Sequence, residues 1–128
     1  MGKPILMMLL AAISGSVYAG WVVVDESSLG KTYVNPSTIS KSGDLVKLWE
    51  LIDFKKAQEY SGESFFSFTS EVQYDCARKS FQTLKTAGIS GHMATGSLVA
   101  SGSGSRQWQP VAGGTAAERS WRFVCGKK

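Results

Sequence analysis

Residues 65–76 alternate between apolar and polar side chains over an unusually long stretch. In the sequence FFSFTSEVQYDC, every second residue from Phe66 to Cys76 falls on one face of an extended chain, and Glu71 and Gln73 fall on the other. A side-chain period of two belongs to the β-strand. The pattern predicts a long strand with a core side and a solvent side, and it places Cys76 on the core side.

A second pattern, close to the C-terminus, predicts a short helix. Thr115 and Glu118 have the T-x-x-E spacing of a capping box, which satisfies free N–H groups where a helix begins. Gly126 suits the left-handed residue that follows a helix. One apolar stripe of this helix would contain Ala117, Trp121, Val124 and Cys125. Because so short a helix is marginal alone, we expect it to dock on the sheet.

The first nineteen residues have the features of a secretory signal peptide. Lys3 is followed by an apolar run over residues 5–13, which is too short to span a bilayer, and residues 17–19 offer a small-residue cleavage site. We expect the mature chain to begin at Gly20. Removing residues 1–19 from 128 leaves 109 residues, enough for one domain over 20–128. No cysteine follows the apolar run, so we expect no lipid anchor and no membrane attachment.

Cys76 and Cys125 are the two cysteines of the chain. In an exported protein a pair of cysteines is most often oxidised, and the predicted strand and helix each turn one of them toward the core. We expect a Cys76–Cys125 disulfide, which stabilises a long loop by about 4 kcal/mol. We expect no metal site, because these cysteines and the single His92 offer too few ligands.

The remaining patterns complete an α+β fold. Strands are predicted at residues 21–28, 32–35, 45–54, 81–86 and 96–101, with the second ending at Pro36, a turn at 41–44 and a polar loop at 55–64. Together with the long strand they indicate a single antiparallel sheet of about five to six strands, connected as a meander. The C-terminal helix would pack on this sheet, tethered by the disulfide.

The sequence offers little for catalysis or for nucleic-acid binding. His92 lies in a connection of small residues and is expected to be an ordinary loop histidine. Asp53 interrupts an apolar strand, where we expect it to face outward or to end the strand. Without Lys3 the net charge of +4 becomes +3, too small and too dispersed to favour a nucleic acid. We predict no enzymatic activity and no cofactor.

Aromatic residues are more numerous than one small core needs, and two interpretations stay open. The surplus packs beneath the helix and the 102–113 loop, which we favour, or it forms a surface that binds a partner. For the second case the candidate partner-binding residues are Trp49, Phe65, Lys55 and Lys56. A different function, a periplasmic carrier of a small apolar ligand, would need a cavity between helix and sheet lined by Phe66, Phe68 and Trp121.

Three segments resemble the surface-adhesin protein E family of Gram-negative bacteria. They are WVVVDESSLGKTYVNPSTISKSGDLVKLWELIDF, SEVQYDCARKSFQTL and WQPVAGGTAAERSWRFVCGK, and together they cover most of the mature chain. The resemblance implies an antiparallel sheet, a C-terminal helix fastened through Cys76 and Cys125, no catalytic residues, and adhesion to host extracellular-matrix proteins.

These observations lead to an expected function and location. We predict an exported, non-enzymatic binding module of the bacterial envelope whose partner is an envelope or host-matrix protein. Since a lipidation cysteine is missing, the expected location is the periplasm, with the cell surface and the medium left open. A homodimer formed through edge strands is also left open.

Overall fold

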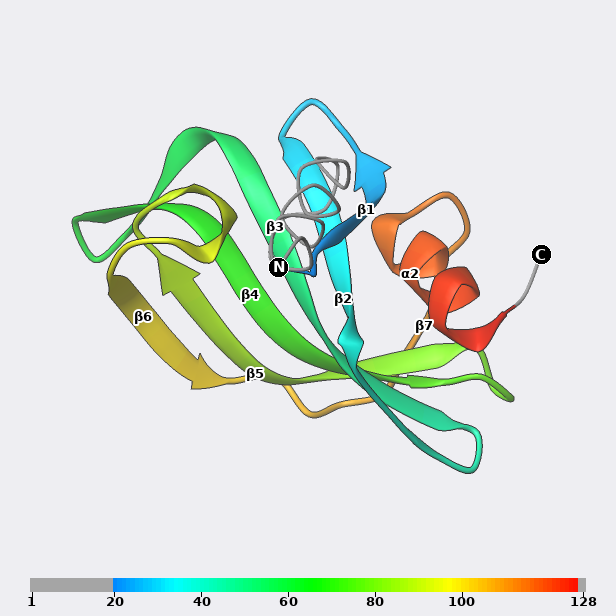
Figure 1. Cartoon of the computed structure of the whole chain (residues 1–128). Coiled ribbons are helices and arrows are strands. Elements are labelled where there is room, and N and C mark those ends of the chain that lie inside the picture. The colour runs from blue at the N-terminus through cyan, green and yellow to red at the C-terminus, as the bar shows by residue number, and fades with distance from the viewer. Residues whose placement is uncertain (1–19, 127–128) are drawn as a thin grey trace, which may run out of the picture.

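The structure, a computed structural model, describes residues 20–126. The predicted signal peptide lies outside the described residues. The elements are β1 (Val22–Glu26), β2 (Gly30–Ser42), β3 (Leu45–Tyr60), β4 (Glu63–Asp75), β5 (Ser80–Ile89), the 3₁₀ turn η1 (His92–Ala94), β6 (Leu98–Ser103), β7 (Gln109–Pro110) and α2 (Ala116–Cys125). Figure 1 shows a strongly twisted sheet with α2 beside β1 and β2, and with β6 at the far edge.

The strands form one antiparallel sheet in the order β1-β2-β3-β4-β5-β6, and β7 pairs with the beginning of β5. The predicted meander with a C-terminal helix is therefore confirmed. The described residues contain seven strands, more than the predicted five to six. The additional strand β7 has only two residues and lies within the Gly/Ser-rich segment, so no alternation of side chains could indicate it.

Strand β2 continues beyond Pro36, contrary to the prediction that the strand ends there. The register between β2 and β3 shifts between Asn35 and Ser40, so the proline lies in an irregular segment that needs no ladder hydrogen bond. There the side-chain oxygen Oγ1 of Thr38 accepts a hydrogen bond of 2.9 Å from the backbone N–H of Trp49. A side chain thus replaces the backbone partner that the irregular segment removes.

Strand β3 extends through most of the predicted 55–64 loop. The register between β3 and β4 shifts between Asp53 and Gln58, and pairing then resumes as far as Tyr60. The turn itself consists of Ser61 and Gly62, which both have positive φ. The prediction of a loop was wrong because the polar residues here are those of an exposed strand end.

Two apolar clusters lie on opposite faces of the sheet. The cluster under α2 contains the buried residues Val34, Val46, Leu48, Val72, Tyr74, Val111, Trp121 and Val124. The cluster on the other face contains Trp21, Tyr33 and Leu51, packed with Trp49, Met93 and Ala94. Turn η1 covers this second face, and it buries Ser67 and Thr69 of β4. The predicted solvent side of β4 is therefore covered where η1 packs on it.

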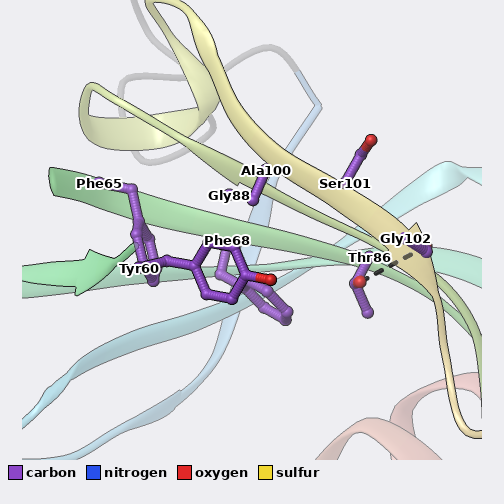
Figure 2. Close-up of a pocket in the computed structure, with 8 residues that line it drawn as sticks. All are labelled: Tyr60, Phe65, Phe68, Thr86, Gly88, Ala100, Ser101 and Gly102. Carbon is purple, nitrogen blue, oxygen red and sulfur yellow. Dashed lines mark hydrogen bonds between the residues drawn. The ribbon is translucent and has the colours of Figure 1, made fainter. Parts of the chain in front are cut away.

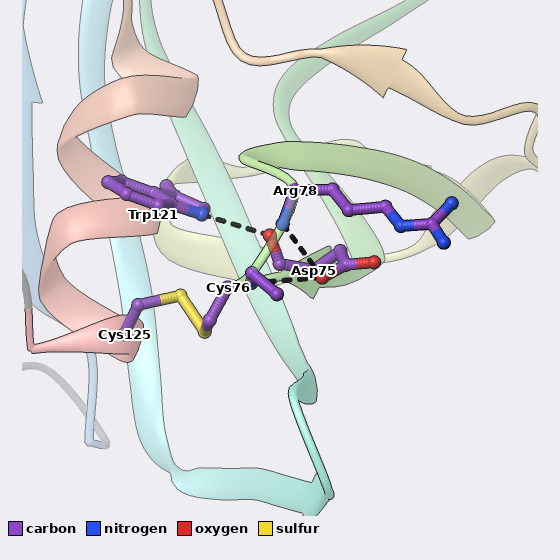
Figure 3. The surroundings of a disulfide bond; sticks show 6 residues. Asp75, Cys76, Arg78, Trp121 and Cys125 are labelled. Carbon is purple, nitrogen blue, oxygen red and sulfur yellow. Dashed lines mark hydrogen bonds between the residues drawn. A yellow bond between two sulfur atoms is a disulfide. The ribbon is translucent and has the colours of Figure 1, made fainter.

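Helix α2 has the predicted ends and the predicted covalent tether. The Thr115 side chain accepts a hydrogen bond from the N–H of Glu118, and Gly126 adopts the left-handed conformation with φ of 68°. The disulfide joins Cys76, just after β4, to Cys125 in the last turn of α2. Beside it the indole Nε1 of Trp121 donates to the Asp75 carbonyl at 3.2 Å (Figure 3). The helix is fixed to the end of β4 by one covalent bond and one hydrogen bond.

Candidate functional site

A groove lies on the face of the sheet that carries α2, beyond the part that the helix covers. Its volume is about 220 Å³, and its lining residues come from β3, β4, β5 and β6. They are Tyr60, Phe65, Phe68, Thr86, Gly88, Ala100, Ser101 and Gly102 (Figure 2). We call this feature the aromatic groove.

The aromatic groove is hollow because small residues lie opposite large ones. In the ladder Gly88 of β5 stands between Phe68 of β4 and Ala100 of β6. A Cβ atom at Gly88 would lie 3.5 Å from the Phe65 ring, so this ring lies directly over the glycine. The Phe65 ring also meets Phe68, with 6.3 Å between the ring centroids. Tyr60 adds a side chain that is 60% exposed.

Strand β6 borders the groove with an unprotected edge. It pairs with β5, and within residues 20–126 no other strand pairs with it. Its sequence LVASGS has no charged residue and no proline, the two devices that usually prevent an edge strand from pairing further. The groove therefore adjoins a row of backbone groups that can pair with another extended chain.

The structure places the predicted partner-binding residues at three separate positions. Phe65 lines the aromatic groove. Lys55 and Lys56 are exposed in the irregular segment of β3 and line a separate depression of about 210 Å³. Phe54, next to Lys55, forms a T-shaped contact with Phe65, so the depression beside the lysines is linked to the aromatic groove through this pair of rings. Trp49 packs with the cluster on the opposite face of the sheet.

Sequence reasoning missed most of the groove. Tyr60 fell in the predicted loop, and Gly88 and Ala100 carry no signal of their own. Their role depends on the β4–β5–β6 register, which sets a glycine and an alanine against two phenylalanines. The surplus of aromatic residues was the only signal in the sequence.

A second cavity, of about 150 Å³, lies between the sheet and the first turn of α2. Its walls include apolar side chains of β3, β4 and β5 together with Ala116 and Ala117 of the helix. Of the three residues predicted to line such a cavity, Phe68 does so. Phe66 instead stacks on His92, with ring centroids 4.4 Å apart, and Trp121 packs in the cluster under α2.

Glu50 of β3 is the one carboxylic acid that lines this second cavity. Its Oε2 atom accepts a hydrogen bond from the hydroxyl of Tyr74, and no Lys, Arg or His among the described residues pairs with it. Burial raises the pKa of Glu50 to about 7, and the hydroxyls of Tyr74 and Ser120 only partly oppose this rise. Burial and the neighbouring Glu50 carboxylate raise the pKa of Tyr74 well above its usual value.

The raised pKa of Glu50 predicts that the protein loses stability as the pH rises. A carboxyl with a higher pKa in the folded state binds its proton more tightly there. Its contribution is complete below the ordinary value of 4.5 and is lost as the pH rises through about 7. The expected loss is at most roughly 3 kcal/mol. The pKa of Glu118 is lowered to about 2 by the Gly114 N–H and Lys79. Its contribution to stability therefore changes only below pH 4.5, outside the range in which Glu50 acts.

Thermal unfolding at pH 5 and pH 8 checks this prediction. The wild-type melting temperature is expected to be lower at pH 8 than at pH 5, whereas the melting temperature of Glu50→Gln is expected to differ much less between the two pH values. Glu59→Gln is a matched control, because Glu59 is exposed on the same strand. Equal pH dependence in wild type and Glu50→Gln would contradict the assignment.

His92 and Asp53 fasten η1 to the sheet. The ring Nδ1 of His92 lies 3.1 Å from the Asp53 carboxylate, which also accepts a 2.8 Å hydrogen bond from the N–H of Met93. Ser67 lies opposite Asp53 in the ladder, but its fully buried hydroxyl donates to the Gly91 carbonyl and accepts from the Ala94 N–H. These contacts position a loop and leave the serine hydroxyl bonded to backbone.

Two further properties bear on the kind of site that this molecule offers. Within residues 20–126, no three His, Cys, Asp or Glu side chains are grouped so that they could hold a metal ion. In the same range no helix has both the length and the apolar character needed to cross a bilayer.

Comparisons with known proteins agree on one family. The model of the family described as surface-adhesin protein E matches residues 21–126. Among solved structures, that of Haemophilus influenzae protein E has a TM-score of 0.69 and 13% identity, and the match covers 86% of each chain. Its crystal form II has a TM-score of 0.70 and 13% identity, and the match covers 86% of this chain and 90% of that one. Protein E from non-typeable Haemophilus influenzae has a TM-score of 0.63 and 12% identity, and the match covers 86% of this chain and 78% of that one. No curated protein matched the chain.

Proposed function

The chain belongs to the surface-adhesin protein E family, and from this premise we propose that it is an exported binding module of the bacterial envelope. Its partner is a protein, and the bound part of that partner is an extended segment. The segment pairs with β6 and places apolar side chains in the aromatic groove. The observation that carries the proposal is the position of the groove directly beside an unpaired, uncharged strand edge.

Strand addition explains why both features are needed. An extended segment that pairs with β6 forms backbone hydrogen bonds, which supply affinity without regard to sequence. Every second side chain of that segment then faces the same side of the sheet as the groove. Tyr60 and Phe65 offer aromatic surface there, and aromatic side chains commonly contribute most at protein interfaces.

Lys55 and Lys56 remain part of the proposal as a secondary contact. Both are exposed and precede Tyr60 on the same strand. The two lysines, only partly offset by the exposed Glu59 on the same strand, favour a partner segment with acidic residues, and such charges mainly accelerate association. Trp49 is not included, because it packs on the other face.

Replacing Tyr60 with alanine is expected to weaken partner binding about tenfold, the loss typical of an aromatic residue in an interface. Tyr60 is 60% exposed, so its removal leaves the fold intact. Binding of the mature domain to a panel of purified extracellular-matrix proteins is measured by interferometry. Trp108→Ala is the matched control, because Trp108 is 45% exposed and lies outside the groove. Equal losses in the two variants, or no saturable binding at all, would overturn the proposal.

A second copy of the chain is a competing occupant of the same edge. Size-exclusion chromatography over a hundredfold concentration range separates the two cases. A monomer at all concentrations supports a different protein as partner. A dimer that Val99→Pro dissociates, because proline removes a backbone donor from β6, would assign the edge to self-association.

Cell fractionation with protease treatment of intact cells tests the location. We propose a periplasmic protein, which is protected in whole cells and released by osmotic shock. Cleavage on intact cells would place the domain on the surface and make a host-matrix protein the partner to examine.

The carriage of a small ligand is a second candidate function. One observation favours it, the cavity of about 150 Å³ between α2 and the sheet. The cavity and the aromatic groove share Phe68 but otherwise have different walls, so each function can be tested by itself.

A further inference from the structure

We propose that the cavity between α2 and the sheet binds a small organic cation, an ammonium group attached to an apolar body of about the size of a benzene ring. This inference rests on the second candidate function and gives the ligand a charge, where the sequence suggested a purely apolar molecule. Three features support the proposal: the size of the cavity, its apolar walls, and the Glu50 carboxyl group in its lining, which forms no ion pair within residues 20–126.

The size and walls of the cavity determine the apolar part of the ligand. A cavity of about 150 Å³ is large enough for a benzene molecule. Apolar side chains from three strands and from the helix form most of the wall, namely Ile52, Phe68, Val72, Phe81, Ala116 and Ala117. Transfer of a small apolar group from water into this apolar cavity is therefore favourable.

Glu50 determines the charge of the ligand. Within residues 20–126 the Glu50 carboxyl group forms one hydrogen bond, in which Oε2 accepts from the Tyr74 hydroxyl, so Oε1 is left to accept a bond from a ligand in the cavity. An ionised carboxylate in such surroundings is costly unless it is paired. An ammonium group is a donor of three hydrogen bonds and supplies the missing positive charge.

Within residues 20–126, no lysine, arginine or histidine forms an ion pair with Glu50. On α2, Arg119 pairs with Asp25 of β1 at 2.7 Å, and Arg122 pairs with Glu118. Lys79, before β5, also pairs with Glu118. The groups that act on Glu50 are hydroxyls, those of Tyr74 from β4 and Ser120 from α2.

Ser120 gives an independent sign that a polar partner is missing here. Its hydroxyl is fully buried on the sheet side of α2 and forms no hydrogen bond with any other residue in the range 20–126. It lies close enough to Glu50 and Tyr74 to lower the pKa of each. Buried hydroxyls are normally bonded. A ligand that reorients the Glu50 carboxylate toward this hydroxyl would satisfy both groups.

Aromatic walls favour a cation over a neutral donor of the same size. Phe68 and Phe81 both line the cavity, and the face of a phenyl ring attracts an ammonium group. The hydroxyls of Ser70 and Thr83, also in the lining, can accept hydrogen bonds from the ammonium N–H groups that do not bind Glu50.

Binding of a cation should depend on pH in a defined direction. Since burial raises the pKa of Glu50 to about 7, the carboxyl is mostly protonated at pH 6 and mostly ionised at pH 8. A cation binds the ionised form, so its affinity is expected to be about tenfold higher at pH 8 than at pH 6. A neutral ligand of the same shape would show no such gain.

Three probes of equal size separate the alternatives. Benzylamine carries the cation, benzyl alcohol is neutral, and benzoate is an anion. Each is titrated into the mature domain at pH 6 and pH 8, and chemical shifts of the Ala116 and Ala117 amides report binding in the cavity. The same titrations are repeated with Glu50→Gln and with the exposed control Glu59→Gln.

The expected result is tighter binding of benzylamine than of either other probe, about tenfold stronger at pH 8, unchanged in Glu59→Gln and reduced at least tenfold in Glu50→Gln. Equal binding of benzylamine and benzyl alcohol would overturn the charge assignment and leave a carrier of apolar ligands. Preferred binding of benzoate would also overturn it. No shift with any probe would overturn the carrier function as well. Wild-type pH dependence tests the proposal even if Glu50→Gln fails to fold.

Discussion

Replacing both Cys76 and Cys125 with alanine is expected to lower the free energy of unfolding by about 4 kcal/mol. The disulfide links residues 49 positions apart. A cross-link that closes a loop of this length reduces the entropy of the unfolded chain, and this raises the free energy of the unfolded state by that amount. Small domains have a total stability of about 5–15 kcal/mol, so this loss removes a large part of it. Urea denaturation of the mature domain measures the change.

The structural consequence should be concentrated in α2. A helix of ten residues is marginal by itself, and the disulfide holds its last turn against the end of β4. Reduction of the wild-type protein is the control, because the chain has no other cysteines and both treatments should give the same destabilisation. An unfolding midpoint that neither treatment changes would show that packing alone fixes the helix.

Replacing Trp121 with alanine is expected to lower the free energy of unfolding by about 3–5 kcal/mol, the usual cost of removing a large buried aromatic side chain. The Trp121 side chain is only 8% exposed and fills the cluster between α2 and the sheet. Its indole N–H donates to the Asp75 carbonyl, and the Lys79 ammonium lies 5.1 Å from its ring centroid. Packing, one hydrogen bond and one cation–π contact are lost together.

Phe123→Ala is the matched control for this experiment. Phe123 is an aromatic residue on the same helix, two positions away, but its side chain is 43% exposed. Its replacement is expected to change stability by less than about 1 kcal/mol. Urea denaturation of both variants distinguishes tertiary packing from helix propensity. Similar losses in the two variants would mean that α2 docks differently from the arrangement described above.

Elements whose signals are local were predicted closely. The helix from Ala116 to Cys125 has its cap, its apolar stripe and its terminal glycine within twelve residues of sequence. The long strand keeps its period of two from Ser67 to Asp75. At its beginning the predicted alternation was wrong, because the register shift places Phe65 beside Phe68 and leaves Phe66 beside His92. These patterns depend on backbone geometry alone, so the sequence contains all that is needed to read them.

Features that depend on pairing register were not predicted. The extension of β3 through Lys55 and Lys56 requires a register shift after Asp53, and only β4 beside it can accommodate that shift. The burial of Ser67 and Thr69 follows from η1, which folds over a face that the alternation assigned to solvent. Neither a shift nor a cover is visible in one strand considered alone.

The candidate sites divide in the same way. The sequence by itself determined that residues 76 and 125 meet, that a capped helix docks on an antiparallel sheet, and that aromatic residues exceed the needs of one core. Only the tertiary structure decided where the surplus lies, because Gly88 and Ala100 form a groove only when the register sets them beside Phe68. It also decided the state of Glu50, whose neighbour Tyr74 comes from another strand and whose cover comes from α2. Exposure and pKa are properties of assembled surfaces, and the order of residues along one chain does not contain them.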